Sequence, residues 1–489
     1  MNPSLLAQVK TKIDAILPEI TALRHRIHQE PELGLDTHAT RQKVLTALNA
    51  ASLQIRAPFI GADLVADLPR PEAEKTICLR ADMDALPVRE ATHLEYQSLF
   101  PGVMHACGHD GHSAILVGTA LVLDAFREEL PVAVRFVFQP GEELVCGGKA
   151  LVRQGVCDDV AAAYAIHNWP GLPAGQIASR SGPLFAAGAM FSIELTGRGC
   201  HGGMPEQGLN PLPAAAALIT KLQDLHDRTH LRDGSVISVC SISAGESKNI
   251  IPDRAIVRGT ARFLSSSAGE RIEADIRRSG AEIASLHGVT VALTYENDYS
   301  LPVLNTAAGY ERVRSTVRRY LSEAAWQELA KPSMTCEDFA FYLEGRQGAM
   351  FLLGNGADSP ALHTAEYDFN DQSLATGIFI MSLLALDHFW PPLVPLFGNK
   401  RLDEPGHGFS QVGCQPFRIV SRQQLSSGQR YFFEPHFASA DGNQKSHRFP
   451  FRRAERQLRL IRLRHRQPVA PSVGAGNRFS GIRVTERKI

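Results

Sequence analysis

Four short apolar runs constrain this chain most, because each of them leads directly to a side chain that can bind a metal ion or transfer a proton. The runs read as buried strands, and helical patterns separate them along the chain. Strands that alternate with helices indicate a largely parallel sheet covered on both faces, with binding sites beyond the carboxyl ends of the strands. The runs are 76–80, 132–138, 161–166 and 349–353, and the side chains that follow them are Asp82, Glu142, Glu143, His167 and His363.

The segment MHACGHDGH, residues 104–112, holds three histidines, one cysteine and one aspartate among its glycines. Cys107 and His109 are separated by one residue, which puts both side chains on the same side of an extended or turning segment. A glycine-rich loop of incidental polar residues is the alternative, and a single histidine is more often an ordinary core or surface residue. Together with the strand-end residues, however, this segment completes a thiolate, imidazole and carboxylate set that suits zinc, with manganese or nickel tolerated.

The candidate ligands outnumber those of one tetrahedral site. Two ions about 3.5–4 Å apart would use them all, if one anionic ligand bridges the pair. Cys107 is a plausible bridge, because a thiol bound to a metal is deprotonated. The predicted ligands are Cys107, His109, Glu143, His167 and His363.

The two adjacent glutamates are expected to differ in role. In an extended loop, neighbouring side chains point opposite ways, so Glu143 can bind metal while Glu142 faces the reacting water as a general base. Asp82 could accept the second ring proton of His109 and orient that ligand. Its alternative is a simple turn aspartate at the end of a strand.

The pattern of apolar and polar residues changes between residues 186 and 299. Alternating strand patterns and one helical stretch there predict a separate α+β unit, inserted into a domain formed by residues 1–185 and 300–390. The predicted strands of the insertion are 190–196, 236–242 and 255–263, and its predicted helix is 212–227; the last helix of the surrounding domain is expected at 371–389.

The charge of the chain is divided unevenly. The first 390 residues hold 33 basic and 45 acidic side chains, and residues 391–489 hold 18 and 6. An acidic body argues against nucleic acid as its main partner. The basic tail lacks sustained periodicity, so we expect a mostly disordered appendage, with a basic arm that binds nucleic acid or a membrane surface as the alternative.

The cysteines and the hydropathy pattern predict a cytoplasmic protein without a membrane anchor. The eight cysteines form no CxxC pair or dense framework, which suits a reducing compartment. The first 20 residues form an amphipathic helix pattern without the apolar core of a signal peptide. The longest apolar stretch, 377–386, is far shorter than the roughly 20 residues of a membrane span.

Nine motifs together resemble the hippurate hydrolase and indole-3-acetyl-amino-acid hydrolase group of binuclear metallo-amidohydrolases, within the aminoacylase/carboxypeptidase-G superfamily. They occur in the family's order between about residues 20 and 390, and together they are highly specific. The motifs are RHRIHQEPELG (24–34), RADMDALP (80–87), MHACGHDGH (104–112), QPGEE (139–143), HNWPGLPAGQI (167–177), GRGCHGGMPE (197–206), NIIPD (249–253), CEDFAFY (336–342) and LHTAEYDFND (362–371).

The resemblance implies a zinc-exopeptidase-like α/β fold and a role for each candidate. It implies the five ligands named above with Cys107 bridging, Glu142 as general base and Asp82 as an orienting residue. The inserted unit becomes a lid and dimerisation domain, residues 186–299. Its His201 would stabilise the oxyanion in the partner subunit's active site. Asn249 and Arg262 would contact the substrate carboxylate or carbonyl; a turn residue and a strand-surface cation are their alternatives.

The chain departs from the family pattern at a few positions without losing any ligand. Gly141 stands where alanine is usual, and Lys248 stands where an apolar residue is commoner. Cys200 and the pair Gly202-Gly203 surround His201, where the family more often has glycine before the histidine and alanine after it. These changes in the insertion leave substrate preference open.

We therefore predict a homodimeric hydrolase that uses two divalent ions, Zn²⁺ or Mn²⁺, with Ni²⁺ tolerated. It would cleave N-acyl amino acids, hippurate-like or N-acetylated, into a carboxylic acid and a free amino acid. An N-acetyl diamino acid deacetylase is an alternative within the same chemistry. A non-catalytic metal- or ligand-binding protein is an alternative of another class, and the presence of Glu142 argues against it, because binding alone needs no base.

Overall fold

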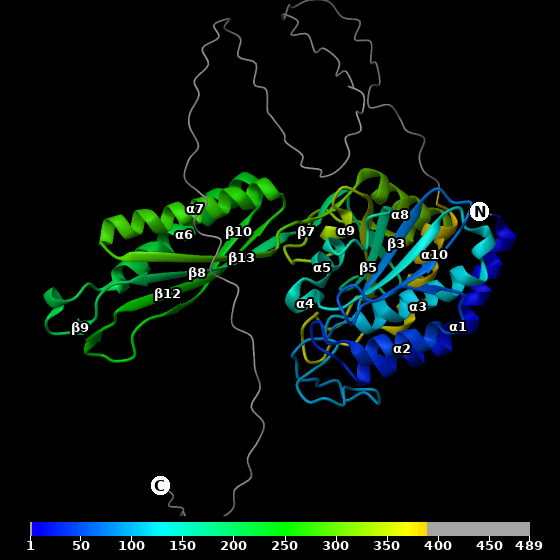
Figure 1. The fold of residues 1–489 in the computed structure, drawn as a ribbon, viewed down its shortest axis with the longest axis horizontal. Helices are drawn as coiled ribbons and strands as arrows, with labels where there is room; N and C mark the ends of the chain where they lie inside the picture. Colours follow the sequence, from blue (N-terminus) through cyan, green and yellow to red (C-terminus); the bar gives the residue numbers. More distant parts are fainter. Residues whose placement is uncertain (1, 389–489) are drawn as a thin grey trace, which may run out of the picture. The chain divides into compact units, whose positions relative to one another are not determined.

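An eight-stranded mixed sheet forms the centre of the catalytic region (Figure 1). The structure, a computed structural model, describes residues 2–388, so the predicted tail and the end of the predicted last helix lie outside the described residues. The strand order is β1-β2-β4-β3-β5-β16-β6-β15. The bounds are β1 Gln54–Ile55, β2 Leu64–Leu68, β3 Thr76–Asp82, β4 Ala133–Gln139, β5 Val160–Pro170, β6 Ile177–Ser179, β15 Trp326–Glu328 and β16 Gln347–Gly356.

The four strands predicted from the apolar runs are neighbours in this sheet. Strands β4, β3, β5 and β16 pair in parallel, while β1, β2 and β6 add antiparallel pairs toward the edges. Successive residues of β3 alternate between two apolar cores: Ile77 and Leu79 face one, and Cys78 faces the other. Both faces of the central strands are therefore buried, which explains their continuous apolar sequences and confirms the predicted α/β class.

Helices cover both faces of the sheet. The larger core lies under five helices: α1 Pro3–Gln29, α2 His38–Leu48, α3 His109–Ala125, α8 Ala307–Tyr320 and α10 Leu374–Leu386. The helix α10 has a largely buried sequence, which fits its apolar character on all sides. The other face packs against the short helices α5 Gly147–Arg153 and α9 Ala340–Leu343.

The inserted unit has a sheet and a core of its own. Its four strands are antiparallel in the order β10-β12-β8-β13, and α6 and α7 pack against them. The bounds are β8 Ala187–Thr196, α6 Pro211–Asp233, β10 Val236–Ser243, β12 Arg254–Phe263, α7 Ser266–His287 and β13 Thr290–Tyr299. A separate two-stranded antiparallel ladder pairs β9 Cys200–His201 with β11 Ile250–Ile251. Neither α7 nor β13 was predicted from the sequence. Most residues of β13 are exposed, and they alternate with half-buried ones over its first part.

The two ends of the insertion are paired with each other. Strand β7, Gly182–Phe185, precedes it, and strand β14, Val303–Asn305, follows it; the two form a separate antiparallel ladder. The boundaries near 186 and 299 and the role of the insertion as a lid and dimerisation domain stay predictions.

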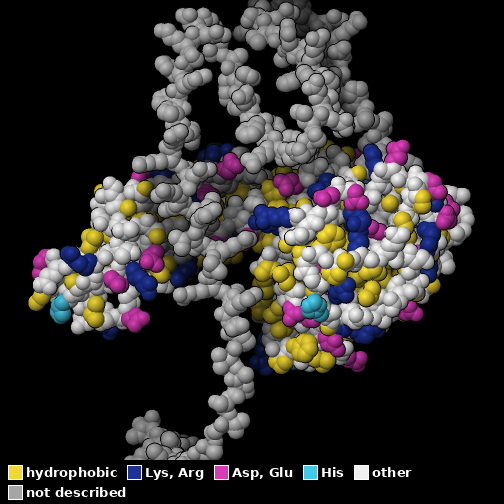
Figure 2. Space-filling view, in the orientation of Figure 1, with side chains coloured by type: hydrophobic (Ala, Val, Ile, Leu, Met, Phe, Trp, Pro, Cys, Tyr) yellow, Lys and Arg dark blue, Asp and Glu magenta, His cyan; other side chains and the backbone are white. Residues whose placement is uncertain are grey.

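The described surface carries both signs of charge. Figure 2 shows basic and acidic side chains interspersed over the visible face. None of the described helices is both long and apolar enough to cross a membrane.

A buried ionic network joins α1 to the start of α3. The side chains of Arg24, His28 and Asp110 are fully buried, and Asp110 Oδ2 lies 2.9 Å from His28 Nδ1 and 3.3 Å from Arg24 Nη1. Glu90 Oε1 lies 3.2 Å from the other ring nitrogen, His28 Nε2. Burial opposes protonation of His28, but its hydrogen bonds to Asp110 and Glu90 outweigh burial and raise its pKa to about 9. This part of the RHRIHQEPELG motif therefore serves packing beneath the site.

The raised pKa of His28 makes part of the stability dependent on pH. Because the folded-state pKa lies above the ordinary value of about 6.5, protonated His28 stabilises the fold fully below pH 6.5 and loses this effect as pH rises through about 9. We expect His28→Gln to lower the free energy of unfolding by roughly 2–3 kcal/mol more at pH 6 than at pH 10. Denaturant unfolding of both proteins at the two pH values measures this difference. A pH-independent difference would contradict the prediction.

Candidate metal centre

The predicted site residues meet at the carboxyl ends of the four parallel strands. Asp82 is the last residue of β3, and Glu142 and Glu143 begin the short helix α4, Glu142–Val145, directly after β4. His167 lies in β5, and His363 lies in the loop after β16. Strands β4, β3, β5 and β16 are adjacent, so their ends bring these side chains to one edge of the sheet.

Gly108 places the thiol and the first histidine. It adopts the left-handed conformation, with φ of 86°, and caps α3, whose first residue is His109. A Cβ atom at Gly108 would lie 2.3 Å from Asn168 Oδ1 and 2.6 Å from the Tyr367 hydroxyl, so only glycine fits there. The tight glycine turn allows the helix to begin at His109 itself.

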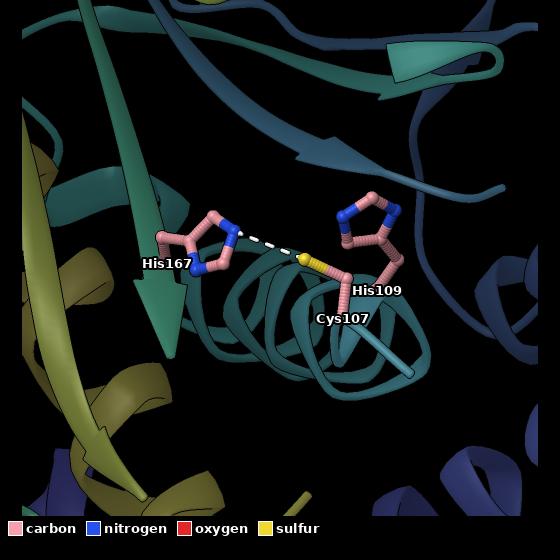
Figure 3. Close-up of side chains that lie close together, drawn as sticks. All are labelled: Cys107, His109 and His167. Atoms are coloured by element: carbon pink, nitrogen blue, oxygen red, sulfur yellow. Dashed lines mark hydrogen bonds between the residues drawn. The ribbon is translucent and has the colours of Figure 1, made fainter. Parts of the chain in front are cut away.

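Two overlapping groups of potential ligands share the cysteine. Cys107, His109 and His167 form one, and Cys107, Glu143 and His363 form the other, with the ligand atoms of each group within 4.8 Å of one another. Cys107 Sγ lies 3.5 Å from His167 Nε2, and Figure 3 shows the sulfur directed toward that ring. Glu143 Oε1 lies 3.2 Å from His363 Nε2 and 3.9 Å from His109 Nε2. A shared cysteine is the arrangement that a bridging ligand requires.

The ring nitrogens of the histidines suit metal binding. His167 Nδ1 donates to the Asn168 carbonyl oxygen at 2.7 Å, which leaves Nε2 facing Cys107 with a free lone pair. Burial lowers the pKa of His167 to about 3, so this ring is neutral. His109 Nε2 is buried and has no hydrogen-bond partner among the described residues. A metal ion would give that orphaned atom a partner.

Binding of a metal ion would release protons from two of these side chains, Cys107 and His109. Burial raises the pKa of the Cys107 thiol, and the nearby carboxylates of Glu143 and Glu142 raise it further. Burial opposes the charge on His109, but Asp82, Asp84 and Glu143 outweigh burial and raise its pKa to about 10. A cation must displace both protons, so the affinity of the site for metal depends on pH.

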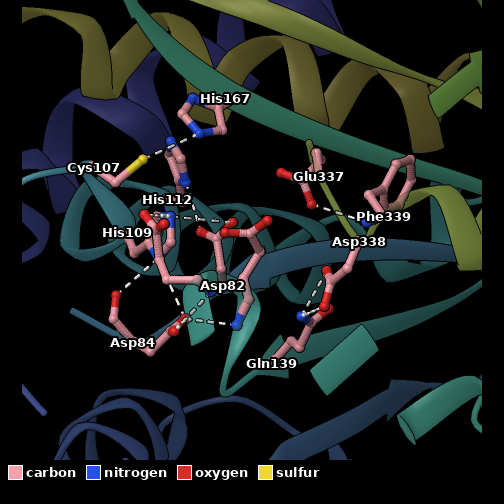
Figure 4. Close-up of polar contacts among 12 residues, drawn as sticks. Asp82, Asp84, Cys107, His109, His112, Gln139, His167, Glu337, Asp338 and Phe339 are labelled. Atoms are coloured by element: carbon pink, nitrogen blue, oxygen red, sulfur yellow. Dashed lines mark hydrogen bonds and ion pairs between the residues drawn. The ribbon is translucent and has the colours of Figure 1, made fainter. Parts of the chain in front are cut away.

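The residue that orients His109 is Asp84, and the prediction of Asp82 for this contact was wrong. His109 Nδ1 donates to the Asp84 carbonyl oxygen at 2.8 Å, whereas Asp82 Oδ2 lies 3.7 Å from the opposite ring nitrogen, Nε2 (Figure 4). The physical reason is the direction of the chain. After β3 the backbone passes the His109 ring, so a main-chain oxygen two residues further on reaches Nδ1.

Asp82 is connected to His167, another candidate ligand, through a chain of hydrogen bonds. Asp82 Oδ1 lies 2.6 Å from His112 Nδ1, and His112 Nε2 accepts from the Asn168 backbone N–H at 2.9 Å. The Asn168 carbonyl in turn holds His167. Arg80 donates to Asp82 Oδ2 at 2.7 Å and thereby fixes the first member of this chain. Asp82 is thus neither free nor a simple turn aspartate.

The Asp84 carboxylate also caps the helix that carries the two glutamates. Its oxygens accept from the backbone N–H groups of Glu142 and Glu143 at 3.0 and 3.1 Å. The predicted extended loop is therefore wrong: both glutamates belong to a helical turn, and one carboxylate oxygen of each lies within 4.8 Å of the other and of a His109 ring nitrogen. Glu142 is buried, and burial together with the charge of Glu337 raises its pKa well above the usual range.

A buried group of carboxylates surrounds Arg80 behind the glutamates. Arg80 Nη2 lies 2.8 Å from Asp338 Oδ1 and 3.1 Å from Glu337 Oε1. Gln139 donates to both Asp338 oxygens (Figure 4). Sequence analysis gave no role to Asp84, His112 or Glu337, although each lies in a quoted motif. The repeat of two aspartates in DMD offered a signal for Asp84, because residues i and i+2 share a face of a strand.

The three candidates from the insertion occupy two different places. Arg262, on β12, lines a cavity of about 380 Å³ together with Glu142, Glu143 and His363. His201 and Asn249 lie at the β9–β11 ladder, and both side chains are exposed. The Gly202 N–H donates to the Asn249 carbonyl oxygen there. Neither of these two lines a cavity at the metal centre of its own chain.

Comparisons with known proteins agree with this geometry. Residues 78–387 match the model of peptidase family M20/M25/M40. The chain is 32% identical to the hippurate hydrolase of Campylobacter jejuni over 374 residues, which cover 76% of this chain and 96% of that protein. It is 32% identical to an N-acetylcysteine deacetylase of Bacillus subtilis over 367 residues, or 74% of this chain and 95% of that protein. A crystal structure of the Bacillus subtilis YXEP protein, described as a dinuclear metal-binding peptidase of the M20 family, superimposes with a TM-score of 0.67 and 30% identity, and covers 76% of this chain and 98% of that one.

The close approach at Gly108 gives a test of the ligand loop. We expect Gly108→Ala to weaken metal binding at least tenfold, because the new Cβ atom must push Cys107 or His109 away from the Asn168 side chain. Gly102→Ala is a matched control: Gly102 also has a positive φ, of 89°, but nothing lies within 4 Å of its Cβ position. Both variants carry about 1–2 kcal/mol of backbone strain. Metal content measured against a competing chelator should fall in the first variant alone, and an equal loss in both would refute the steric argument.

Proposed function

The chain belongs to peptidase family M20/M25/M40, and on that premise we propose that it is a metal-dependent amidohydrolase of N-acyl amino acids. Water cleaves the amide bond to give a carboxylic acid and a free amino acid. The observation that carries the proposal is the position of Glu142. This buried carboxylate lies beside a complete set of metal ligands and on the wall of both cavities that open there.

The ligand set is Cys107, His109, Glu143, His167 and His363, with Cys107 bridging two divalent ions. We propose Zn²⁺ or Mn²⁺, with Ni²⁺ tolerated, because the set mixes a thiolate, imidazoles and a carboxylate. When bound, such ions polarise the substrate carbonyl and lower the pKa of water. Neighbouring groups hold these ligands in place: the Asp84 carbonyl orients His109, and Asp82 acts through His112 and Asn168 on His167.

Glu142 is proposed to move the proton. It takes a proton from the attacking water and returns it to the leaving nitrogen, so that the amine departs neutral. The short helix α4 holds Glu142 beside Glu143 through the Asp84 cap, which keeps the base and the ligand at fixed positions. The Tyr299 hydroxyl donates to the Glu142 carbonyl oxygen and ties the end of β13 to this helix.

The insertion is proposed to recognise the substrate and to join two subunits. Arg262 lines the cavity next to the base and suits a substrate carboxylate. His201 and Asn249 are proposed to act in the partner subunit's active site, with His201 stabilising the oxyanion. Both residues are exposed at the β9–β11 ladder and line neither cavity at the metal centre of their own chain, which supports action across a homodimer. The cysteine pattern favours a cytoplasmic enzyme.

Substitution of the two glutamates tests the function and separates their roles. The metal-loaded protein should hydrolyse N-acyl amino acids, and chelation should abolish this activity until Zn²⁺ or Mn²⁺ is returned. Glu142→Gln should keep both ions and lower kcat by a factor of about 10² or more, the range of general acid–base catalysis. Glu143→Gln should lose metal. Steady-state kinetics with parallel metal analysis measures both effects, and the opposite pattern would exchange the two roles.

Mixed dimers test the partner role of His201. We expect His201→Ala homodimers and Glu142→Gln homodimers each to be nearly inactive. After subunit exchange, a heterodimer contains one site with both an intact base and an intact partner histidine, so activity should return to about one quarter of wild type at a 1:1 mixture. The control is exchange of each variant with itself. Verified heterodimers without recovered activity would mean that His201 does not act across the interface.

A further inference from the structure

Strand β13 of the insertion carries a β-bulge at its end. On β13, Glu296 pairs with Met190 of β8, and Tyr299 pairs with Gly188. Two residues separate these positions on β13, but one residue separates them on β8. A bulge inserts one residue into a strand, and each inserted residue reverses the face to which later side chains point. The bulge therefore directs Tyr299 toward the cavity that Glu142 also lines.

The bulged end of β13 contacts both ends of the short helix α4. The Tyr299 hydroxyl donates to the carbonyl oxygen of Glu142, the first residue of α4. The Asp298 carbonyl oxygen accepts from Cys146 Sγ at 3.5 Å and from Lys149 Nζ at 3.2 Å, and Lys149 Nζ also lies 3.3 Å from Asp298 Oδ1. Cys146 directly follows the last residue of α4. Two successive residues of the insertion therefore hold the helix at its beginning and just after its end.

The position of α4 depends on contacts from outside the helix. It has four residues, and an isolated helix of this length is not stable in water. On one side, the Asp84 carboxylate accepts from the N–H groups of Glu142 and Glu143. On the other side, the contacts come from β13. The backbone of the proposed base is therefore held between the eight-stranded sheet and the sheet of the insertion.

One row of the insertion's sheet joins Tyr299 to the side chain proposed to bind the substrate. Gly188 pairs with Arg262 of β12 on one side and with Tyr299 of β13 on the other. Paired residues of antiparallel strands point to the same face of a sheet, and neighbouring strands lie about 4.8 Å apart. The backbones of Arg262 and Tyr299 are therefore about 10 Å apart, and both residues line the cavity beside Glu142. The sheet thus relates the proposed substrate contact to the backbone of the base.

We propose that Tyr299 is a positioning residue for the general base: its hydroxyl fixes the Glu142 backbone where proton transfer requires it, so catalysis depends on the contact between the insertion and α4. The inference rests on the proposed amidohydrolase function. Tyr299 itself transfers no proton, because its hydroxyl is directed to a main-chain oxygen. Misplacement of a catalytic group by about 1 Å can lower a rate by about 10²-fold, so loss of this contact should lower kcat at least tenfold. KM and metal content should stay close to wild type, because neither Arg262 nor a proposed ligand is changed.

Two identical substitutions on the same strand provide the test. Tyr299→Phe removes the hydroxyl that contacts Glu142. Tyr295→Phe is the matched control, because the Tyr295 hydroxyl is buried and has no hydrogen-bond partner among the described residues. Metal-loaded full-length enzyme is assayed on N-benzoylglycine or N-acetylglycine, whichever the wild type hydrolyses faster. Tyr299→Phe should lower kcat at least tenfold, change KM less than twofold and keep both ions, and Tyr295→Phe should leave all three unchanged. A smaller fall in kcat, an equal fall in both variants, or a fall explained by lost metal would overturn the proposal.

Hydrogen–deuterium exchange separates this proposal from the proposed function. In Tyr299→Phe the backbone N–H groups of residues 142–146 should exchange at least tenfold faster than in wild type, and in Tyr295→Phe they should exchange at the wild-type rate. If the wild type is active, kcat decides, and an unaffected kcat overturns the positioning role while the amidohydrolase function stands. If the wild type hydrolyses no N-acyl amino acid, the proposed function fails and the exchange decides. Faster exchange in Tyr299→Phe alone then supports the hold of Tyr299 on α4, and equal exchange overturns it.

Discussion

Parallel pairing of β4, β3, β5 and β16 is the constraint on which the rest of the structure depends. Adjacent parallel strands must all end at one edge of the sheet, so the loops that leave them share a small region. Each loop contributes one or two functional side chains, and none could reach the others from a different strand order. The fifth ligand position, Cys107, comes from the turn before α3, where Gly108 allows the backbone to pass against Asn168. The metal centre is a consequence of topology combined with one glycine.

The cost of this arrangement is an accumulation of buried negative charge. Asp82, Asp84, Glu142, Glu337 and Asp338 are all almost fully buried, and Arg80 is the arginine that contacts three of them. Burying unpaired carboxylates is expensive, and one guanidinium cannot neutralise them all. Two divalent cations in the adjoining ligand set would offset this excess. Ions bound there for catalysis would therefore also stabilise the fold.

The sequence predicted those parts of the site that depend on strand ends, and it missed those that depend on the path of the backbone between them. Glu143, His167 and His363 each follow an apolar run, so their convergence could be expected before the fold was known. That Asp84, and not Asp82, is the partner of His109 Nδ1 could not be expected. This contact is made by a main-chain oxygen, whose position has no signature in the sequence. The helical turn at Glu142 likewise needs the Asp84 cap, a contact between residues 58 positions apart. In the insertion, β13 went unpredicted although its half-buried Val291, Leu293 and Tyr295 alternate with exposed residues, the period expected of a strand.

Both sheets contribute to the wall of the cavity beside Glu142. Gly188, Met190 and Arg262 belong to the four-stranded sheet of the insertion, whereas Glu142 and Glu143 follow β4 of the eight-stranded sheet. Substitutions at sites without shared partners have nearly additive effects on free energy. Residues of the insertion that line this cavity without a contact to Glu142 can therefore change during evolution while the metal-binding edge of the larger sheet stays intact.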